Sequence, residues 1–146
     1  MTLWHGMWEE GSLGRVEAEA GFWLVLGLMV LLFPARFLLG VLSAAFVHEM
    51  GHIIALRLLG GRVLGVRLHS CGARIEAAPM DPGPAAICAL AGPAAGAMCI
   101  LAWRWFPELA LAAVVQTIFN LIPVYPLDGG RAVRNICCKL RNFRVQ

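Results

Sequence analysis

The chain has 146 residues, of which 60% are hydrophobic and only 14% are charged, and its mean hydropathy is +0.73. Soluble domains are about 45–50% apolar and about 25% charged, so this composition excludes a disordered chain and does not suit an ordinary cytosolic enzyme. The net charge of +3 is spread between apolar blocks and does not indicate nucleic-acid binding. The composition therefore predicts an integral membrane protein.

The N-terminal part of the chain predicts a flank followed by a short span. Acidic residues outnumber basic ones in residues 1–19, which is the wrong charge for a cleaved signal peptide. Residues 20–35 are then free of charge but end at Pro34. We expect a helix there that is not cleaved off. It either crosses a thin part of the membrane, crosses at a tilt, or is re-entrant.

Three longer segments contain no Asp, Lys or Arg, and each is close to the length that crosses a bilayer. They cover residues 37–56, 82–103 and 109–127. A helix of about 20 apolar residues crosses a hydrocarbon core of about 30 Å. The sequence thus predicts an all-α polytopic membrane protein with about four transmembrane helices in a single domain, residues 1–146.

The segment between the second and third spans predicts a small β-hairpin, with strands at 62–69 and 73–77. This segment is rich in arginine, and the tail 129–146 is basic too, whereas the opposite links hold only Arg36 and Arg104. Positively charged loops stay in the cytoplasm. We therefore expect the hairpin and both termini on the cytosolic side of a multi-pass protein.

The second span contains His48-Glu49-Met50-Gly51-His52, although ionisable groups inside a membrane cost several kcal/mol and usually serve a function. Residues four apart share a helix face, so both imidazoles can bind one zinc ion. Glu49, about 100° around the helix, can reach a water at that zinc. This is the HExxH pattern of metalloproteases, in which Glu is the general base. The alternative is a purely structural His–Glu pair.

A catalytic zinc usually has three protein ligands, and Asp128 is the only acidic residue that closes an apolar span. His48 and Asn120 each lie twelve residues into a helix that descends from the outer side, which is about 18 Å. Pro123 and Pro126 then interrupt the last helix. Asp128 can therefore turn towards the histidines, although an ordinary Asp-Gly turn would look the same.

Other candidate groups have simpler explanations. His69 and Cys71 in the hairpin could be extra metal ligands or a redox gate, but two ligands make an incomplete site and ordinary loop residues are the preferred reading. Cys137 and Cys138 could be palmitoylated, which we do not expect. Gly92-Pro93 and the small residues around them predict close helix packing.

The HExxH motif, together with NLIPVYPLDGGR at residues 120–131, resembles the site-2 protease family of intramembrane zinc metalloproteases. The resemblance covers about residues 37 to 135 and is nearest to the small bacterial type that processes a sigma-factor precursor in sporulation. It implies that His48, His52 and Asp128 bind one Zn²⁺ ion. It also implies that Glu49 is the catalytic base and that Asn120 positions the substrate peptide. We expect the chain to lack the PDZ domain of larger relatives and, because only eighteen residues follow Asp128, to lack their C-terminal nucleotide-sensing domain.

We expect regulated intramembrane proteolysis of transmembrane or membrane-associated proteins in a bacterial cytoplasmic membrane. Asn120 and the unwound backbone near Pro123 would hydrogen-bond the oxyanion or the substrate strand. Partners would be the substrate, the bilayer and regulatory membrane proteins or further copies of the chain, but no nucleic acid. Two alternatives stay open: a metal-transporting or zinc-binding membrane protein, and a non-catalytic membrane adaptor that keeps the fold.

Overall fold

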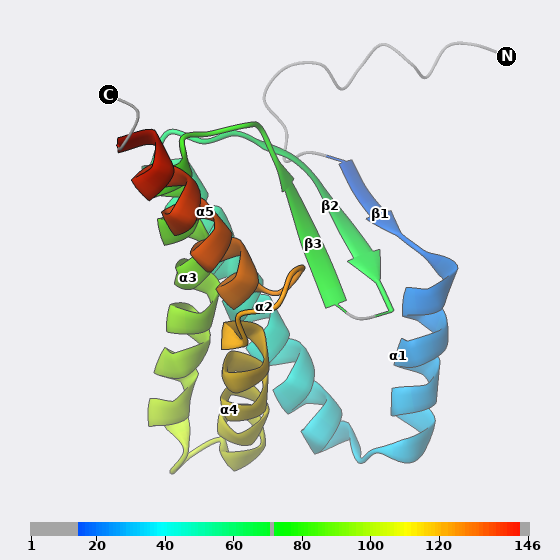
Figure 1. Cartoon of the computed structure of the whole chain (residues 1–146). Helices are drawn as coiled ribbons and strands as arrows, with labels where there is room; N and C mark the ends of the chain where they lie inside the picture. The colour runs from blue at the N-terminus through cyan, green and yellow to red at the C-terminus, as the bar shows by residue number, and fades with distance from the viewer. Residues whose placement is uncertain (1–14, 71, 144–146) are drawn as a thin grey trace, which may run out of the picture.

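The computed structural model describes residues 15–70 and 72–143, and these residues are mostly helical, with one small sheet (Figure 1). Residues 1–14 of the expected flank 1–19, Cys71, and residues 144–146 of the expected tail lie outside the described residues. The elements in chain order are β1 (Arg15–Ala18), α1 (Ala20–Leu32), α2 (Ala35–Leu58), β2 (Val63–His69), β3 (Gly72–Ala77), α3 (Pro82–Cys99), the 3-10 helix η1 (Ile100–Ala102), α4 (Pro107–Leu121) and α5 (Asp128–Phe143).

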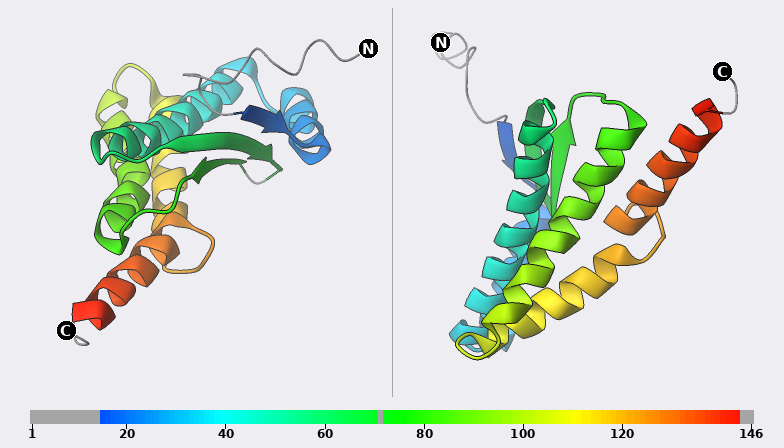
Figure 2. Two further views of the ribbon diagram at one scale, coloured as in Figure 1. Left: turned by 90° about the horizontal axis from the view of Figure 1, so that it is seen from above. Right: turned by 90° about the vertical axis from the view of Figure 1, so that its left-hand side faces the viewer.

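The helices α2, α3 and α4 pack against one another, and α5 packs mainly against α3. Figure 2 shows α1 apart from these four helices, with the sheet beside it. Prolines separate the elements: Pro34 caps the start of α2, and Pro82 and Pro107 occupy the first position of α3 and α4. Proline suits a helix start because its missing N–H would have no helical partner there.

Small and polar side chains form the interior, while large apolar side chains cover the outside. The buried residues of α2 recur at every fourth position: Gly40, Ala44, His48, His52 and Leu56. The buried positions of α3 are also small, whereas leucines, phenylalanines and tryptophans are widely exposed. A water-soluble protein buries such residues. This inversion fits helices that face lipid and contact each other through small residues.

The sheet has the order β1-β2-β3, so β2 is its central strand. The two strands expected on either side of residues 70–72 pair antiparallel, with Val66 opposite Ile75. β1 was not expected: it comes from the N-terminal flank and pairs parallel to β2, with Val16 opposite Val66. Arg67 of β2 lies 3.6 Å from Glu17 and 3.0 Å from Glu76, and so bridges both outer strands.

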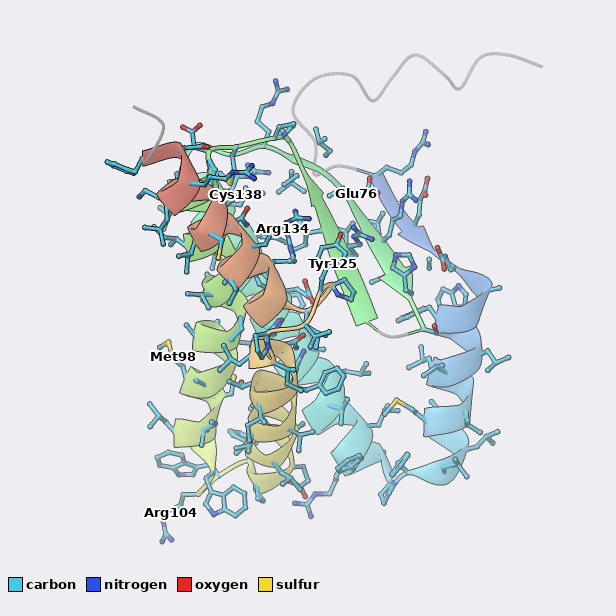
Figure 3. All side chains as sticks on the ribbon, viewed as in Figure 1. Glu76, Met98, Arg104, Tyr125, Arg134 and Cys138 are labelled. Carbon is cyan, nitrogen blue, oxygen red and sulfur yellow. The ribbon has the colours of Figure 1, made fainter. Side chains whose placement is uncertain are left out.

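Two helices, Ala35–Leu58 and Pro82–Ala102, are long and apolar enough to cross a membrane, while α1 and α4 are shorter apolar helices. Charged side chains lie towards both ends of these helices: Figure 3 labels Arg104 at one end, and Glu76 and Arg134 towards the other. At the Arg104 end, Arg36 and Glu108 form a 3.0 Å ion pair that joins the starts of α2 and α4.

The last part of the chain follows the expectation up to the prolines and differs from it beyond them. α4 ends at Leu121, just before the two prolines that were expected to interrupt the span 109–127, and residues 128–143 form α5 where we expected a basic tail. Pro123 and Pro126 have no N–H to continue the helix, which explains the early end of α4. Apolar and charged residues alternate with helical spacing in α5, so it presents both an apolar and a basic face.

Candidate metal centre

Three buried side chains from α2 and α5 meet in one place. Asp128 Oδ2 lies 3.0 Å from His48 Nε2 and 3.1 Å from His52 Nε2, and the two imidazole nitrogens are 3.2 Å apart. His48 is 2% exposed, His52 9% and Asp128 6%. The proximity of Asp128 to both histidines, expected from the sequence, is confirmed.

The spacing of these three atoms suits a tetrahedral metal ion. Zinc–nitrogen and zinc–oxygen bonds of about 2.0–2.1 Å place neighbouring tetrahedral ligands about 3.3–3.4 Å apart. The observed triangle has edges of 3.0–3.2 Å, so a shift of a few tenths of an ångström produces one face of such a tetrahedron. A tetrahedral ion held by these three atoms would keep one further coordination position. The group therefore fits a metal ion with two nitrogen ligands and one carboxylate ligand.

The histidines have room because α3 carries glycine where it meets them. A Cβ on Gly92 would collide with the ring atoms of His52. Gly51 of α2 is equally restricted, since its Cβ would lie 2.6 Å from both the Ala91 carbonyl oxygen and Ala95 Cβ. The two helices thus cross closely at the level of the site, and the small residues of α3 leave space for two imidazoles.

Groups around the three side chains orient them. His52 Nδ1 lies 2.7 Å from the carbonyl oxygen of Cys88. An Nδ1–H that donates to this oxygen leaves the Nε2 lone pair free for a metal, as is usual for ligating histidines. Arg131 Nη1 lies 3.5 Å from Asp128 Oδ1, the carboxylate oxygen that does not face the histidines. One oxygen of Asp128 is therefore directed to the site and the other to Arg131.

The loop before α5 brings Asp128 back to α2. Residues 122–127 fold against the first turn of α5, where a Cβ on Gly129 would collide with the Leu121 carbonyl and one on Gly130 with the backbone of Val124. The two glycines after Asp128 are therefore required for this close approach. The irregular path predicted for the loop is observed.

The other predicted site residues have varied surroundings. Glu49 is half-buried and interacts electrostatically with His48, His52 and Asp128. Asn120 is half-buried in the last turn of α4, and Pro123 is exposed in the loop.

His69 lies away from the three-residue group and pairs with Glu19 at 3.0 Å. Cys137 is exposed and Cys138 half-buried, both as free thiols. Within residues 15–70 and 72–143, His48, His52 and Asp128 are the one group with metal-binding geometry.

Several groups that surround the three candidate ligands were not recognised from the sequence. The Cys88 carbonyl is a backbone group, so no side-chain pattern could reveal it. Arg131 was interpreted only as one of the basic tail residues that set the membrane orientation, and Gly92 was interpreted only as a packing residue. Gly92 and Gly96 are four residues apart, as are the two histidines, and this equal spacing could have indicated that the glycines face the imidazoles.

A solved structure has the same architecture. The chain matches a site-2 protease from Methanocaldococcus jannaschii with a TM-score of 0.72 and 22% sequence identity, over 89% of this chain and 70% of that protein. The chain has the fold of a site-2 protease. No protein-family model and no curated protein matches it.

Proposed function

We propose that the chain is an intramembrane zinc metalloprotease of the site-2 protease family. It hydrolyses peptide bonds of transmembrane or membrane-associated proteins. One observation carries the proposal: the buried group of His48, His52 and Asp128 on the fold of a site-2 protease. The ion would be Zn²⁺, held by these three residues, since two imidazoles and a carboxylate with an open fourth position are typical of catalytic zinc.

Bound zinc supplies Lewis acidity, which lowers the pKa of water and polarises the scissile carbonyl. Glu49 acts as the general base: its carboxylate takes one proton from the attacking water as the oxygen bonds to the carbonyl carbon. The protonated Glu49 then gives this proton to the departing amine nitrogen as the C–N bond breaks. Its place next to His48 on α2 and its half-buried environment support this role.

The substrate would bind as an extended strand, because the amides of a transmembrane helix are shielded until it unwinds. β1 pairs with one edge of β2 and β3 with the other, and β3 has no further strand on its outer edge among the described residues. A peptide could add there through main-chain hydrogen bonds. Asn120 and the backbone near Pro123 would then hold the peptide or the oxyanion near the site.

The membrane placement is part of the same proposal. Helices α1 to α4 would form four spans, with the hairpin, α5 and both termini on the cytosolic side of a bacterial cytoplasmic membrane. The basic residues of the hairpin and α5 support this orientation. The subgroup would be the small sporulation-protease type, which the motif of residues 120–131 supports.

Metal removal tests the proposal. The purified chain is reconstituted in liposomes with single-span membrane proteins that carry a tag at each end. We expect cleavage within or next to the span, its loss after treatment with a zinc chelator, and its return when Zn²⁺ is added. A bound zinc with no cleavage would favour a zinc-binding membrane protein. The absence of both would favour a non-catalytic adaptor, and cleavage that resists the chelator would exclude the metal mechanism.

A further inference from the structure

Two buried polar atoms next to the metal centre have no hydrogen-bond partner within the described part of the chain: His48 Nδ1 and Thr117 Oγ1. His48 is 2% exposed and Thr117 8%. An unsatisfied buried polar group destabilises the folded state, so natural proteins rarely keep one. Two of them beside one candidate site therefore need an explanation.

Both atoms border the same small space over α3. A Cβ placed on Gly96 would lie 2.9 Å from Thr117 Oγ1 and 3.7 Å from His48 Nδ1. Gly96 has no side chain, so nothing from α3 separates the hydroxyl of α4 from the imidazole of α2. Both atoms therefore lie within 4 Å of one point above Gly96, and rotation of Thr117 or a shift of α4 is the movement by which they would approach each other.

Without a hydrogen bond to Thr117, only one of the two histidines has an acceptor for its Nδ1–H. His52 already has an acceptor for its Nδ1–H, the Cys88 carbonyl at 2.7 Å. A ligating histidine almost always donates its second ring N–H to an acceptor, which sets the tautomer and strengthens the ligand. Among the residues that the structure describes, His48 Nδ1 lacks such a partner, and Thr117 Oγ1 is the other buried side-chain atom without one.

We propose that Thr117 is the positioning residue for His48: its hydroxyl oxygen accepts the hydrogen bond from Nδ1–H and keeps Nε2 available for zinc. A helical threonine can donate its own hydroxyl hydrogen to a carbonyl of the preceding turn, which leaves oxygen lone pairs for the imidazole. This inference rests on the proposed zinc site but not on proteolysis. It gives α4 a direct part in a metal centre whose three proposed ligands come from α2 and α5.

The test compares Thr117→Val, which keeps the shape but removes the acceptor, with Thr117→Ser, which keeps the hydroxyl. The matched control is Ser43→Ala, which deletes a hydroxyl from an exposed position of α2. The zinc dissociation constant of each purified full-length protein is measured by competition with a chromogenic chelator. Thermal unfolding of the metal-free proteins reports folding.

We expect Thr117→Val to bind zinc about 10–100-fold more weakly than wild type, the usual effect of losing such a partner. Thr117→Ser and Ser43→Ala should stay close to the wild-type value. If Thr117→Val fails to fold, Thr117→Ala is compared with Thr117→Ser in its place. Unchanged affinity without the hydroxyl, or equal weakening in Thr117→Ser, would overturn the inference alone. A wild-type chain that binds no zinc would overturn the proposed function as well, whereas one that binds zinc without cleavage would contradict only the protease.

Discussion

The imidazole of His52 occupies the space that a Cβ on Gly92 would fill. This relationship joins α2 to α3 at the candidate metal centre, because the Cys88 carbonyl, one turn before Gly92 on α3, also orients the ring by accepting a hydrogen bond from His52 Nδ1. The position of one proposed zinc ligand thus depends on the helix that faces it. A stripe of small residues, interpreted from the sequence as packing, therefore also shapes the site.

Gly92→Ala should displace His52 and abolish stoichiometric zinc binding. The added methyl group overlaps the ring, and overpacking of this kind typically costs about 1–3 kcal/mol. Elemental analysis and thermal unfolding of the purified protein measure both effects. Gly27→Ala is the matched control, since a Cβ on Gly27 of α1 meets nothing within 4 Å. Full zinc occupancy in Gly92→Ala would show that the site does not depend on this contact.

Substitution of Asp128 should weaken zinc binding more than substitution of Arg131. Asp128→Asn keeps the size of the side chain but removes the charge that faces both histidines, so we expect a loss of more than about 100-fold, beyond the usual effect of an outer partner. Arg131→Gln removes the contact to the other carboxylate oxygen, which is long at 3.5 Å, and should cost about 10-fold. Competition with a chelator measures both losses.

Arg141→Gln, a change at an exposed position of the same helix, is the control for the Arg131 variant and should leave zinc affinity unchanged. An Arg131 variant that weakens zinc more than the Asp128 variant would contradict the assignment of Asp128 as a ligand.

Arg67 should contribute little to stability despite its two ion pairs. It bridges Glu17 and Glu76 across the sheet, but its side chain is 49% exposed. Exposed pairs contribute about 0.2–1 kcal/mol each. We expect Arg67→Ala to lower the free energy of unfolding by no more than about 2 kcal/mol and to leave zinc binding intact. Loss of zinc in this variant would mean that the sheet supports the metal centre directly.

The proposed topology predicts opposite accessibility for the two ends of the helices. In a cysteine-free background, Arg104→Cys should react with a membrane-impermeant maleimide added outside intact cells. Glu76→Cys, in β3 at the other end, should react only after permeabilisation (Figure 3). Labelling of both or of neither from outside would contradict the four-span arrangement.

The sequence predicted the parts of this molecule that depend on local spacing. Two histidines four residues apart must share a helix face. Two prolines after Asn120 end a helix, so the chain could be predicted to turn and bring Asp128 towards the histidines. β1 was missed because its partner lies about fifty residues away and no short-range pattern reports such a pairing. The role proposed for Thr117 could not be inferred from the sequence for a related reason: a single hydroxyl in an apolar helix indicates nothing until the histidine and the glycine that other helices place next to it are known.

The most direct test of the proposed protease is Glu49→Gln, assayed in H₂¹⁸O with the doubly tagged membrane proteins. Wild type should bind one zinc and place ¹⁸O in the new carboxyl terminus. Glu49→Gln should still bind one zinc but cleave at least about 100-fold more slowly, because the general base is missing. Glu108→Gln, at the far end of α4, should retain both properties. Cleavage by Glu49→Gln at the wild-type rate would contradict the proposed mechanism.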